Sequence, residues 1–286
     1  METMLEGRGK KVVIGDGRPT VIIGERINPT GKKKLAAALV AGNLDVVRQE
    51  ALAQIEAGAD VLDVNVGAAG VDEVALLPQA VKRVIETADV PICIDTADGK
   101  ALAAALAMYK ELNPGGKPLI NSVNGEEASL ARVLPLVQEY GAAVIGLCMD
   151  DDGIPETPEG RLKVAEKIVE RAKAQGISRE NVLIDCLALT VGADSKAAWT
   201  TLEAIRLVRE TLGVNLSLGA SNVSFGLPER EILNGAFIAM AIAQGLNCPI
   251  VDAAKVQPYI LAADLALGRD GYAMRYIKAF RKRKKG

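Results

Sequence analysis

The 286-residue chain contains no histidine. This absence excludes the Ser-His-Asp and Cys-His arrangements of nucleophilic catalysis, zinc sites with histidine ligands, and imidazole as a general acid or base. Aromatic residues make up only 3% of the chain. No apolar run reaches the length of about 18 residues that a membrane span requires. Any catalysis by this chain must therefore rely on carboxylates, amides, lysines or a cofactor.

Cysteines are few and scattered. The chain has four of them, with no Cys-x-x-Cys pair, at Cys93, Cys148, Cys186 and Cys248. Each lies in or beside a predicted strand, which is typical of small core residues rather than of zinc or iron–sulfur ligands. We therefore predict no metal site in this chain.

The charges nearly balance, with a formal net charge of -2. This balance argues against a general nucleic-acid binder, which needs a strongly basic face. The segment Met1–Glu6 lacks the charged-then-apolar pattern of a signal peptide. We expect a soluble, cytoplasmic protein with neither a nucleic-acid partner nor a membrane partner. The basic tail from Lys278 to Gly286 is interpreted as a solvated helix end, favoured by the helix dipole.

Eight near-continuous apolar runs have the character of strands that are buried on both faces. They are Val21–Gly24, Val61–Val64, Pro91–Ile94, Pro118–Ile120, Ala143–Leu147, Val182–Ile184, Leu216–Gly219 and Cys248–Val251. Helical patterns lie between them, at 44–58, 71–88, 100–112, 127–140, 158–175, 195–212, 228–246 and 257–285. The alternation of strands and helices favours a (β/α)₈ TIM barrel over a doubly wound sheet. No linker interrupts the pattern, so residues 1–286 are predicted to form a single domain.

The amino-terminal part carries one further turn signal. Gly15-Asp16-Gly17 separates Lys11–Ile14 from Val21–Gly24, which predicts a hairpin over residues 11–24. Its first run would be a small lid strand at the bottom of the barrel, and its second run the first barrel strand.

Polar side chains follow every predicted strand, and none of them is His or Lys. They are Glu25 and Asn28, Asp63 and Asn65, Asp95, Asn121 and Asn124, Asp150, Asp185, Asn222 and Asp252. One such residue would cap the following helix, but eight strand ends converge on one rim in a barrel, where the active site forms. The resulting cup of acceptors and amides suits a flat heterocycle with donors on one edge, since a carboxylate can accept two parallel N–H bonds from an amino-pyrimidinone.

Asp95 and Asp185 would be costly to bury without a partner. We expect a ligand for them, and the alternatives are an ion pair with Arg26 or a solvated strand end. Asn222 follows the strand in Leu216–Pro228, and its amide can donate and accept at once. It therefore suits a ligand nitrogen that gains or loses a proton, although it could also cap the next turn.

Six short motifs occur in order along the chain. They read Ile23-Gly24-Glu25-Arg26-Ile27-Asn28, Leu62-Asp63-Val64-Asn65-Val66-Gly67, Ile94-Asp95-Thr96, Ile120-Asn121-Ser122-Val123-Asn124, Ile184-Asp185 and Ser221-Asn222-Val223-Ser224. This set, spread over Val21 to Phe280, resembles the pterin-binding methyltransferases that move a methyl group between tetrahydrofolate and a corrinoid. The likeness is strongest to the methyltetrahydrofolate:corrinoid/iron–sulfur protein methyltransferases, and next to the folate domain of cobalamin-dependent methionine synthase.

The resemblance implies that Asp95, Asn121 and Asp185 hold the pterin, with Asp185 on its amino-pyrimidinone edge. It also implies that Asn222 is catalytic and approaches the pterin nitrogen that carries the methyl group. Supporting positions in the same motifs are Asp63, Asn65, Asn124 and Ser224, together with Glu25 and Asn28, whose role stays open.

The reaction implied is an SN2-type transfer between 5-methyltetrahydrofolate and the cobalt of a corrinoid (cobalamin). The chain lacks a histidine for the lower cobalt ligand and the length for a second domain. We therefore expect the corrinoid on a separate, transiently docking protein. A homodimer is implied by the resemblance alone.

Two other functions stay open. A dihydropteroate synthase-like enzyme would need an anion-binding loop, which Arg26–Lys34 could provide, and basic residues near the last strands. The last strand instead continues as Val251-Asp252-Ala253-Ala254-Lys255, with no Ser-Arg pair. A non-catalytic folate-binding subunit of a corrinoid complex would bind the pterin without methyl transfer.

Overall fold

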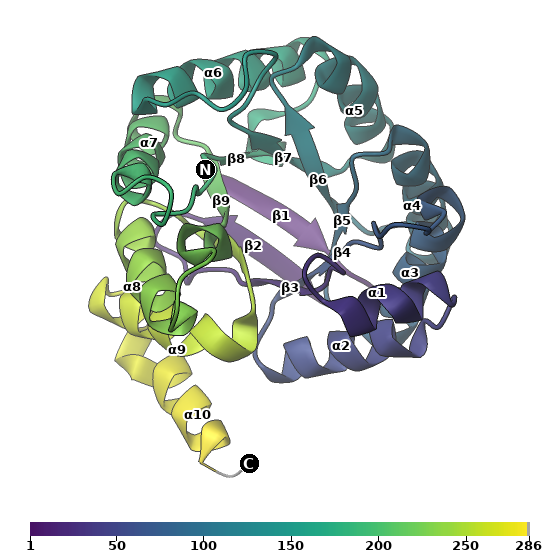
Figure 1. Ribbon diagram of the computed structural model, residues 1–286, viewed down its shortest axis with the longest axis horizontal. Helices are drawn as coiled ribbons and strands as arrows, with labels where there is room; N and C mark the ends of the chain where they lie inside the picture. The colour runs from purple at the N-terminus through teal and green to yellow at the C-terminus, as the bar shows by residue number, and fades with distance from the viewer. Residues whose placement is uncertain (285–286) are drawn as a thin grey trace.

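A closed barrel of eight parallel strands forms the centre of the molecule in the computed structural model, which describes residues 1–284 (Figure 1). The strands follow one another around the barrel in chain order, and β10 closes it against β3. They are β3 (Ile23–Ile27), β4 (Val61–Val64), β5 (Ile92–Asp95), β6 (Leu119–Asn124), β7 (Ala143–Leu147), β8 (Val182–Asp185), β9 (Asn215–Gly219) and β10 (Cys248–Val251). The predicted single-domain TIM barrel is confirmed.

Helices surround the barrel on its outside (Figure 1). They are α1 (Lys33–Val40), α2 (Asp45–Glu56), α3 (Glu73–Thr87), α4 (Gly99–Leu112), α5 (Glu127–Tyr140), α6 (Pro158–Ala174), α7 (Ala197–Leu212), α8 (Arg230–Ala243), α9 (Ala253–Ala266) and α10 (Met274–Arg283), with 3₁₀ turns η1 (Arg179–Asn181), η2 (Ala220–Ser224) and η3 (Gly271–Ala273). The helix predicted over 257–285 is two helices, because the chain turns at Gly268 and again at Tyr272 and Ala273, which all have positive φ. Lys285 and Gly286 lie outside the described residues. Within residues 1–284, the helices are too short or too polar to cross a membrane.

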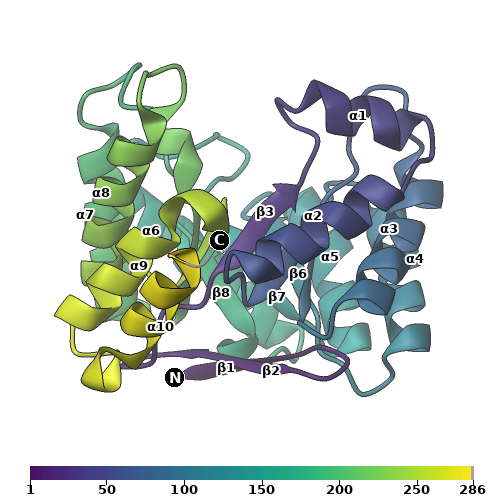
Figure 2. The same cartoon turned by 90° about the horizontal axis from the view of Figure 1, so that it is seen from below.

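The amino-terminal hairpin differs from the prediction. Lys11–Gly15 forms β2, but it pairs in antiparallel fashion with β1 (Glu2–Glu6) and not with residues 21–24. The β1–β2 ribbon lies across one end of the barrel (Figure 2). Backbone bonds from Glu6 to Lys117 and from Gly9 to Asp89 join it to the segments that lead into β6 and β5. It therefore closes the amino-terminal end, as expected of a lid.

Two apolar cores stabilise this arrangement. One fills the space between the strands and the surrounding helices. The other lies inside the barrel, where Leu5 and Ile14 of the ribbon join inward-facing residues such as Cys93 and Leu183, all of them fully buried. Because the ribbon and this core fill the lower end of the barrel, polar side chains are left to the carboxyl ends of the strands.

Candidate active site

Strands β4, β5 and β6 bring four of the predicted site residues together at their carboxyl ends. Asp95 lies beside Asn121 in the register of β5 and β6. The Nδ2 atom of Asn65 donates a hydrogen bond of 2.9 Å to Oδ2 of Asp95, and that of Asn121 donates one of 3.4 Å to Oδ1 of Asp63. The Gly67 amide donates to Oδ1 of Asn65 at 2.8 Å, which fixes the orientation of the Asn65 side chain. The predicted cluster is therefore one connected network.

The two carboxyl groups of this network have raised pKa values. Burial, and then the charge of Asp95, raise the pKa of Asp63 well above its usual value. Burial also raises the pKa of Asp95 to about 6, although hydrogen bonds from Asn65 and Asp63 oppose the shift. Both carboxyl groups therefore hold their protons to a higher pH than an exposed aspartate does.

The ion pair with Arg26 that the sequence left open for Asp95 and Asp185 does not form. Arg26 instead bonds to Glu50 through Nε, at 3.2 Å, and reaches Asp252 at 3.4 Å. Both acids of the expected site are thus left without this cation.

Asp185 ends β8 and is 4% exposed. Its Oδ1 accepts the Leu187 N–H at 2.7 Å, and its Oδ2 accepts the Gly219 N–H at 3.0 Å. Burial raises the pKa of Asp185 to about 6, against the opposing effects of these two bonds and of the charge of Arg161. Each oxygen of the carboxylate can accept one more hydrogen bond, so the group can still bind a ligand with two N–H donors.

Asn222 lies in η2, directly after β9, and its side chain is exposed. The η2 turn is closed by the main chain, where the Phe225 N–H donates to the Asn222 carbonyl at 3.1 Å. The side-chain amide makes no hydrogen bond with the described residues, so it caps no turn there. Its Nδ2 lies 4.0 Å from the point that a Cβ of Gly219 would occupy. The η2 turn that contains Asn222 follows directly after Gly219, whose N–H binds Asp185.

Glu25 lies inside β3 and connects this strand to η2, because the Ser221 hydroxyl donates to its Oε1 at 3.0 Å. Burial raises the pKa of Glu25, and the Ser221 bond opposes the shift. The loop that follows is closed by Lys32, whose Nζ donates to the carbonyls of Glu25, Arg26 and Asn28 at 3.1, 3.2 and 3.1 Å. The sequence offered this loop as an anion site, whereas here the Lys32 ammonium is used by the main chain.

The other supporting asparagines serve the backbone. Oδ1 of Asn28 accepts the Thr30 N–H at 3.0 Å, and Oδ1 of Asn124 accepts the Glu126 N–H at 3.0 Å. Both are short-range turns of the kind that Asn favours. The structure therefore places these two residues at the rim as loop-forming residues.

Three further strand-end residues are also engaged elsewhere. Ser224 is buried and accepts the Arg230 Nε–H at 2.9 Å, while Asp150 accepts the Asp152 N–H at 3.1 Å. Asp252 pairs with Arg26, as described above. Several of the eight polar strand ends thus have partners elsewhere in the chain, and Asp95, Asn121, Asp185 and Asn222 stay the predicted ligand residues, with Asp63, Asn65 and Glu25 as predicted supporting residues.

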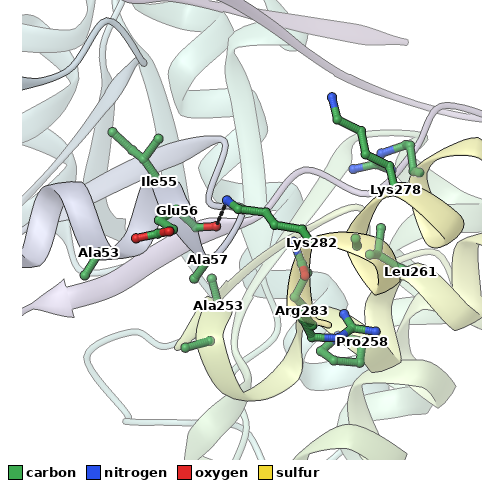
Figure 3. Close-up of a pocket in the computed structure, with 15 residues that line it drawn as sticks. Ala53, Ile55, Glu56, Ala57, Ala253, Pro258, Leu261, Lys278, Lys282 and Arg283 are labelled. Atoms are coloured by element: carbon green, nitrogen blue, oxygen red, sulfur yellow. Dashed lines mark hydrogen bonds between the residues drawn. The ribbon is translucent and has the colours of Figure 1, made fainter. Parts of the chain in front are cut away.

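A cavity of about 730 Å³ lies on the outside of the barrel, between α2, α9 and α10 (Figure 3). Its lining includes Leu261 and the basic residues Lys278, Lys282 and Arg283, and none of the predicted site residues. Lys282 extends across it and donates to the Glu56 carbonyl, at the end of α2 (Figure 3). The basic tail is thus only partly the solvated helix end that the sequence indicated, because Lys282 caps another helix.

Fold and rim together define a (β/α)₈-barrel protein whose candidate ligand site, at the carboxyl ends of the strands, consists of acids and amides. Residues 24–252 match the family of pterin binding enzymes, and the chain belongs to this family. The enzyme class and the family resemblance predicted from the sequence are confirmed.

Among curated proteins, the chain is 31% identical over 274 residues to the methylcorrinoid:tetrahydrofolate methyltransferase of Eubacterium limosum, covering 93% of this chain and 98% of that protein. It is 33% identical to the methionine synthases of Mycobacterium leprae and Mycobacterium tuberculosis, but spans only 21% of their length. Among solved structures, a Yersinia pestis dihydropteroate synthase superimposes with a TM-score of 0.69 at 18% identity, over 94% of this chain. This last likeness concerns the fold alone.

Proposed function

We propose that this enzyme transfers a methyl group between 5-methyltetrahydrofolate and the cobalt of a corrinoid that a separate protein carries. The similarity to the Eubacterium limosum enzyme, over nearly the whole of both chains, supports this class of reaction. The observation that carries the proposal is the amide of Asn222, which has no partner among the described residues and lies three residues after Gly219, whose N–H binds Asp185, at a rim that also holds Asp95 and Asn121. Homodimerisation stays a prediction.

The pterin would lie across the rim. Its amino-pyrimidinone edge offers two parallel N–H donors, which match the two oxygens of Asp185. Asp95 and Asn121, on the neighbouring strands β5 and β6, would bond to other polar atoms of the bicycle. Because Asp185 is buried, Asp95 is half-buried and neither forms an ion pair with Arg26, a ligand with several N–H groups would stabilise their ionised forms.

The chemical problem is the leaving group. The methyl-bearing nitrogen of the folate is a tertiary amine, so it must gain a proton from water as its bond to the methyl carbon breaks. Asn222 can donate through Nδ2 to the neutral nitrogen and, after its amide turns over, accept through Oδ1 from the protonated one. Such a contact would be stronger in the transition state than in the ground state, which is what accelerates a reaction. The corrinoid, when it docks with its carrier protein, supplies the cobalt that takes or gives the methyl group.

The substitution Asn222→Ala tests this role. We expect the rate of methyl transfer in a single turnover to fall by about 10²- to 10³-fold, or about 2.7–4 kcal/mol in the barrier, as for the loss of one preorganised donor. The dissociation constant of methyltetrahydrofolate should change much less. Asn43→Ala, at an exposed asparagine before α2, is the matched control and should keep the wild-type rate. Near-normal turnover with tight folate binding in Asn222→Ala would remove this residue from the mechanism.

A spectrum separates methyl transfer from folate binding alone. When the protein and methyltetrahydrofolate are mixed with a reduced free corrinoid, we expect the absorption of methyl-cobalt to appear. Folate binding without this signal, even with a corrinoid protein present, would indicate a non-catalytic folate-binding subunit instead. Formation of dihydropteroate from a pterin pyrophosphate would indicate the synthase activity.

A further inference from the structure

Arg161, in α6, is fully buried, with 1% of its surface exposed. It belongs to none of the motifs that suggested the site. A guanidinium group is costly to remove from water unless its donors are satisfied, and burial lowers the pKa of Arg161. The hydrogen-bond acceptors of Arg161 therefore indicate which part of the structure it supports.

The hydrogen bonds of Arg161 converge on the loop that follows β8. Its Nη1 donates to the Cys186 carbonyl at 2.9 Å and to the Leu187 carbonyl at 2.9 Å. The same nitrogen reaches Oγ1 of Thr201, in α7, at 3.1 Å, and Nε donates to the Pro155 carbonyl at 3.1 Å. All four acceptors are neutral, so no partner cancels the charge of the guanidinium.

The Cys186 carbonyl belongs to the same peptide group as the Leu187 N–H, which donates to Oδ1 of Asp185. In a trans peptide group these two atoms point in opposite directions within one plane. Holding the carbonyl on Arg161 therefore directs the N–H toward Asp185. The turn needs this support, because Leu187 has a φ of 61°, in the left-handed region that side chains with a Cβ disfavour.

We propose that Arg161 is a positioning residue for Asp185: it holds the Cys186–Leu187 peptide so that its N–H faces the carboxylate, and its charge favours the ionised form of Asp185. The consequence for substrate rests on the proposed function, in which ionised Asp185 accepts two N–H donors of the pterin. The positioning itself is a property of this chain and can be measured without any ligand.

Arg161 is the main charge that acts on Asp185. The other titratable groups facing this region are the thiols of Cys148, at the end of β7, and of Cys186, in the loop itself. The hydrogen bond with Cys186, and then burial, raise the pKa of Cys148 well above its usual value, so that thiol stays neutral. Strand β9 contributes only neutral groups, namely Ser217 in register with Asp185 and the Gly219 N–H.

The first experiment follows the carboxyl carbon of Asp185 by ¹³C NMR during a pH titration of the ligand-free protein, with the signal assigned from Asp185→Asn. We expect a midpoint near the pKa of about 6 in the wild type. In Arg161→Gln the midpoint should rise by about 1 pH unit or more, because a nearby positive charge is lost. Arg171→Gln, on the exposed side of the same helix, is the matched control and should leave the midpoint unchanged.

The second experiment measures methyltetrahydrofolate binding by isothermal titration calorimetry. A midpoint that moves up by one unit predicts that the dissociation constant of Arg161→Gln rises about fivefold more at pH 6 than at pH 8. Arg161→Lys keeps the charge but cannot hold both carbonyls in the same way. The Arg161→Lys variant should therefore weaken binding by the same factor at pH 6 as at pH 8. A role in folding alone would lower the folded fraction without moving the midpoint.

The possible outcomes distinguish a failure of the positioning role of Arg161 from a failure of the proposed function. A folded Arg161→Gln with an unshifted Asp185 midpoint overturns the positioning role. If Arg161→Gln does not fold, Arg161→Lys decides the question, and wild-type affinity in that variant overturns the role. If the wild type does not bind methyltetrahydrofolate, the proposed function fails, whereas the NMR titration still tests the relation between Arg161 and Asp185.

Discussion

Replacing Asp185 by asparagine should weaken folate binding strongly while changing the free energy of unfolding at pH 7 only a little. Asn has one oxygen where the carboxylate has two, so it cannot accept both the Leu187 and Gly219 N–H groups and the ligand as well. A hydrogen bond to a charged group is worth about 1.5–3 kcal/mol. Since each 1.4 kcal/mol is tenfold in affinity, we expect the dissociation constant of methyltetrahydrofolate to rise by roughly 10- to 150-fold.

The same substitution should change the stability little at pH 7. Burial raises the pKa of Asp185 from 3.8 to about 6, and at 1.36 kcal/mol per unit the ionised carboxylate costs the folded state about 3 kcal/mol. Asn removes this cost, but it leaves one buried N–H without an acceptor, at about 1–3 kcal/mol. The two effects nearly cancel.

The raised pKa of Asp185 also predicts in which direction the stability changes with pH. A carboxyl group with a raised pKa in the folded state contributes stability below its unfolded pKa, and this contribution is lost as the pH rises through the folded value. The wild type should therefore lose stability between pH 4 and pH 7 through Asp185, whereas Asp185→Asn should not. The variant should gain up to about 3 kcal/mol relative to the wild type over this range.

Calorimetric titration with methyltetrahydrofolate measures the dissociation constant. Urea unfolding at pH 4 and at pH 7 measures the change in stability. Asp150→Asn, after the neighbouring strand, is the matched control, because among residues 1–284 the Asp150 side chain accepts the Asp152 N–H and has no other partner. It should keep the wild-type affinity. Unchanged folate affinity in Asp185→Asn, with a folded protein, would refute the assignment of this carboxylate to the ligand.

Two further substitutions test the packing and the acid pair, each by urea unfolding at pH 7. Gly235→Ala should destabilise the protein by about 1–3 kcal/mol, because the new Cβ would lie 2.6 Å from the Tyr259 ring, whereas Gly115→Ala, with nothing within 4 Å, should be neutral. For Asp63→Asn, unfolding at pH 4 as well as pH 7 should show that the variant gains stability relative to the wild type as the pH rises, because burial and the charge of Asp95 raise the pKa of Asp63 in the folded state. A stability difference that does not change with pH would contradict this raised pKa.

The barrel could be predicted because its strands are nearly continuous apolar runs. The predicted strand Pro91–Ile94 lies within one residue of β5, and Val182–Ile184 within one residue of β8. Helix ends that carry a capping residue or a proline could be predicted equally well. Thr157, a residue type that favours helix starts, caps α6 by accepting the Gly160 N–H at 3.1 Å, just before Pro158.

The lid hairpin could not be assigned in the same way. The turn signal at 15–17 is real, but it does not identify which strand the first run pairs with. Residues 2–6 alternate between exposed and buried side chains, as a half-buried strand does, yet they bury Leu5 only because the floor of the barrel lies above it. Pairing that depends on a distant surface leaves little trace in the local sequence.

For single site residues, too, the local sequence does not show which partner a side chain will have. Asn28, Asn124 and Asn222 all follow strands, and the residue type suits both a turn and a ligand. Only the structure distinguishes the two that bond to the backbone from the one that does not. Arg161 did carry a signal, since it shares the apolar face of α6 with Val164 and Ile168. A charged residue in such a position predicts a buried partner.

The two ends of the barrel use similar polar residues for opposite purposes. At the lower end, Asn215 donates to Oγ1 of Thr3 at 2.8 Å and accepts from Asn247 at 2.7 Å, so this buried network is satisfied and holds the lid. At the upper end, Asn222 has no partner among the described residues, and Asp185 keeps unused acceptor capacity at the expense of stability. Polar groups that lower the stability of the folded chain are retained where a ligand can use them. Asn215 thus stabilises the scaffold, whereas Asn222 keeps its amide available at the predicted ligand site.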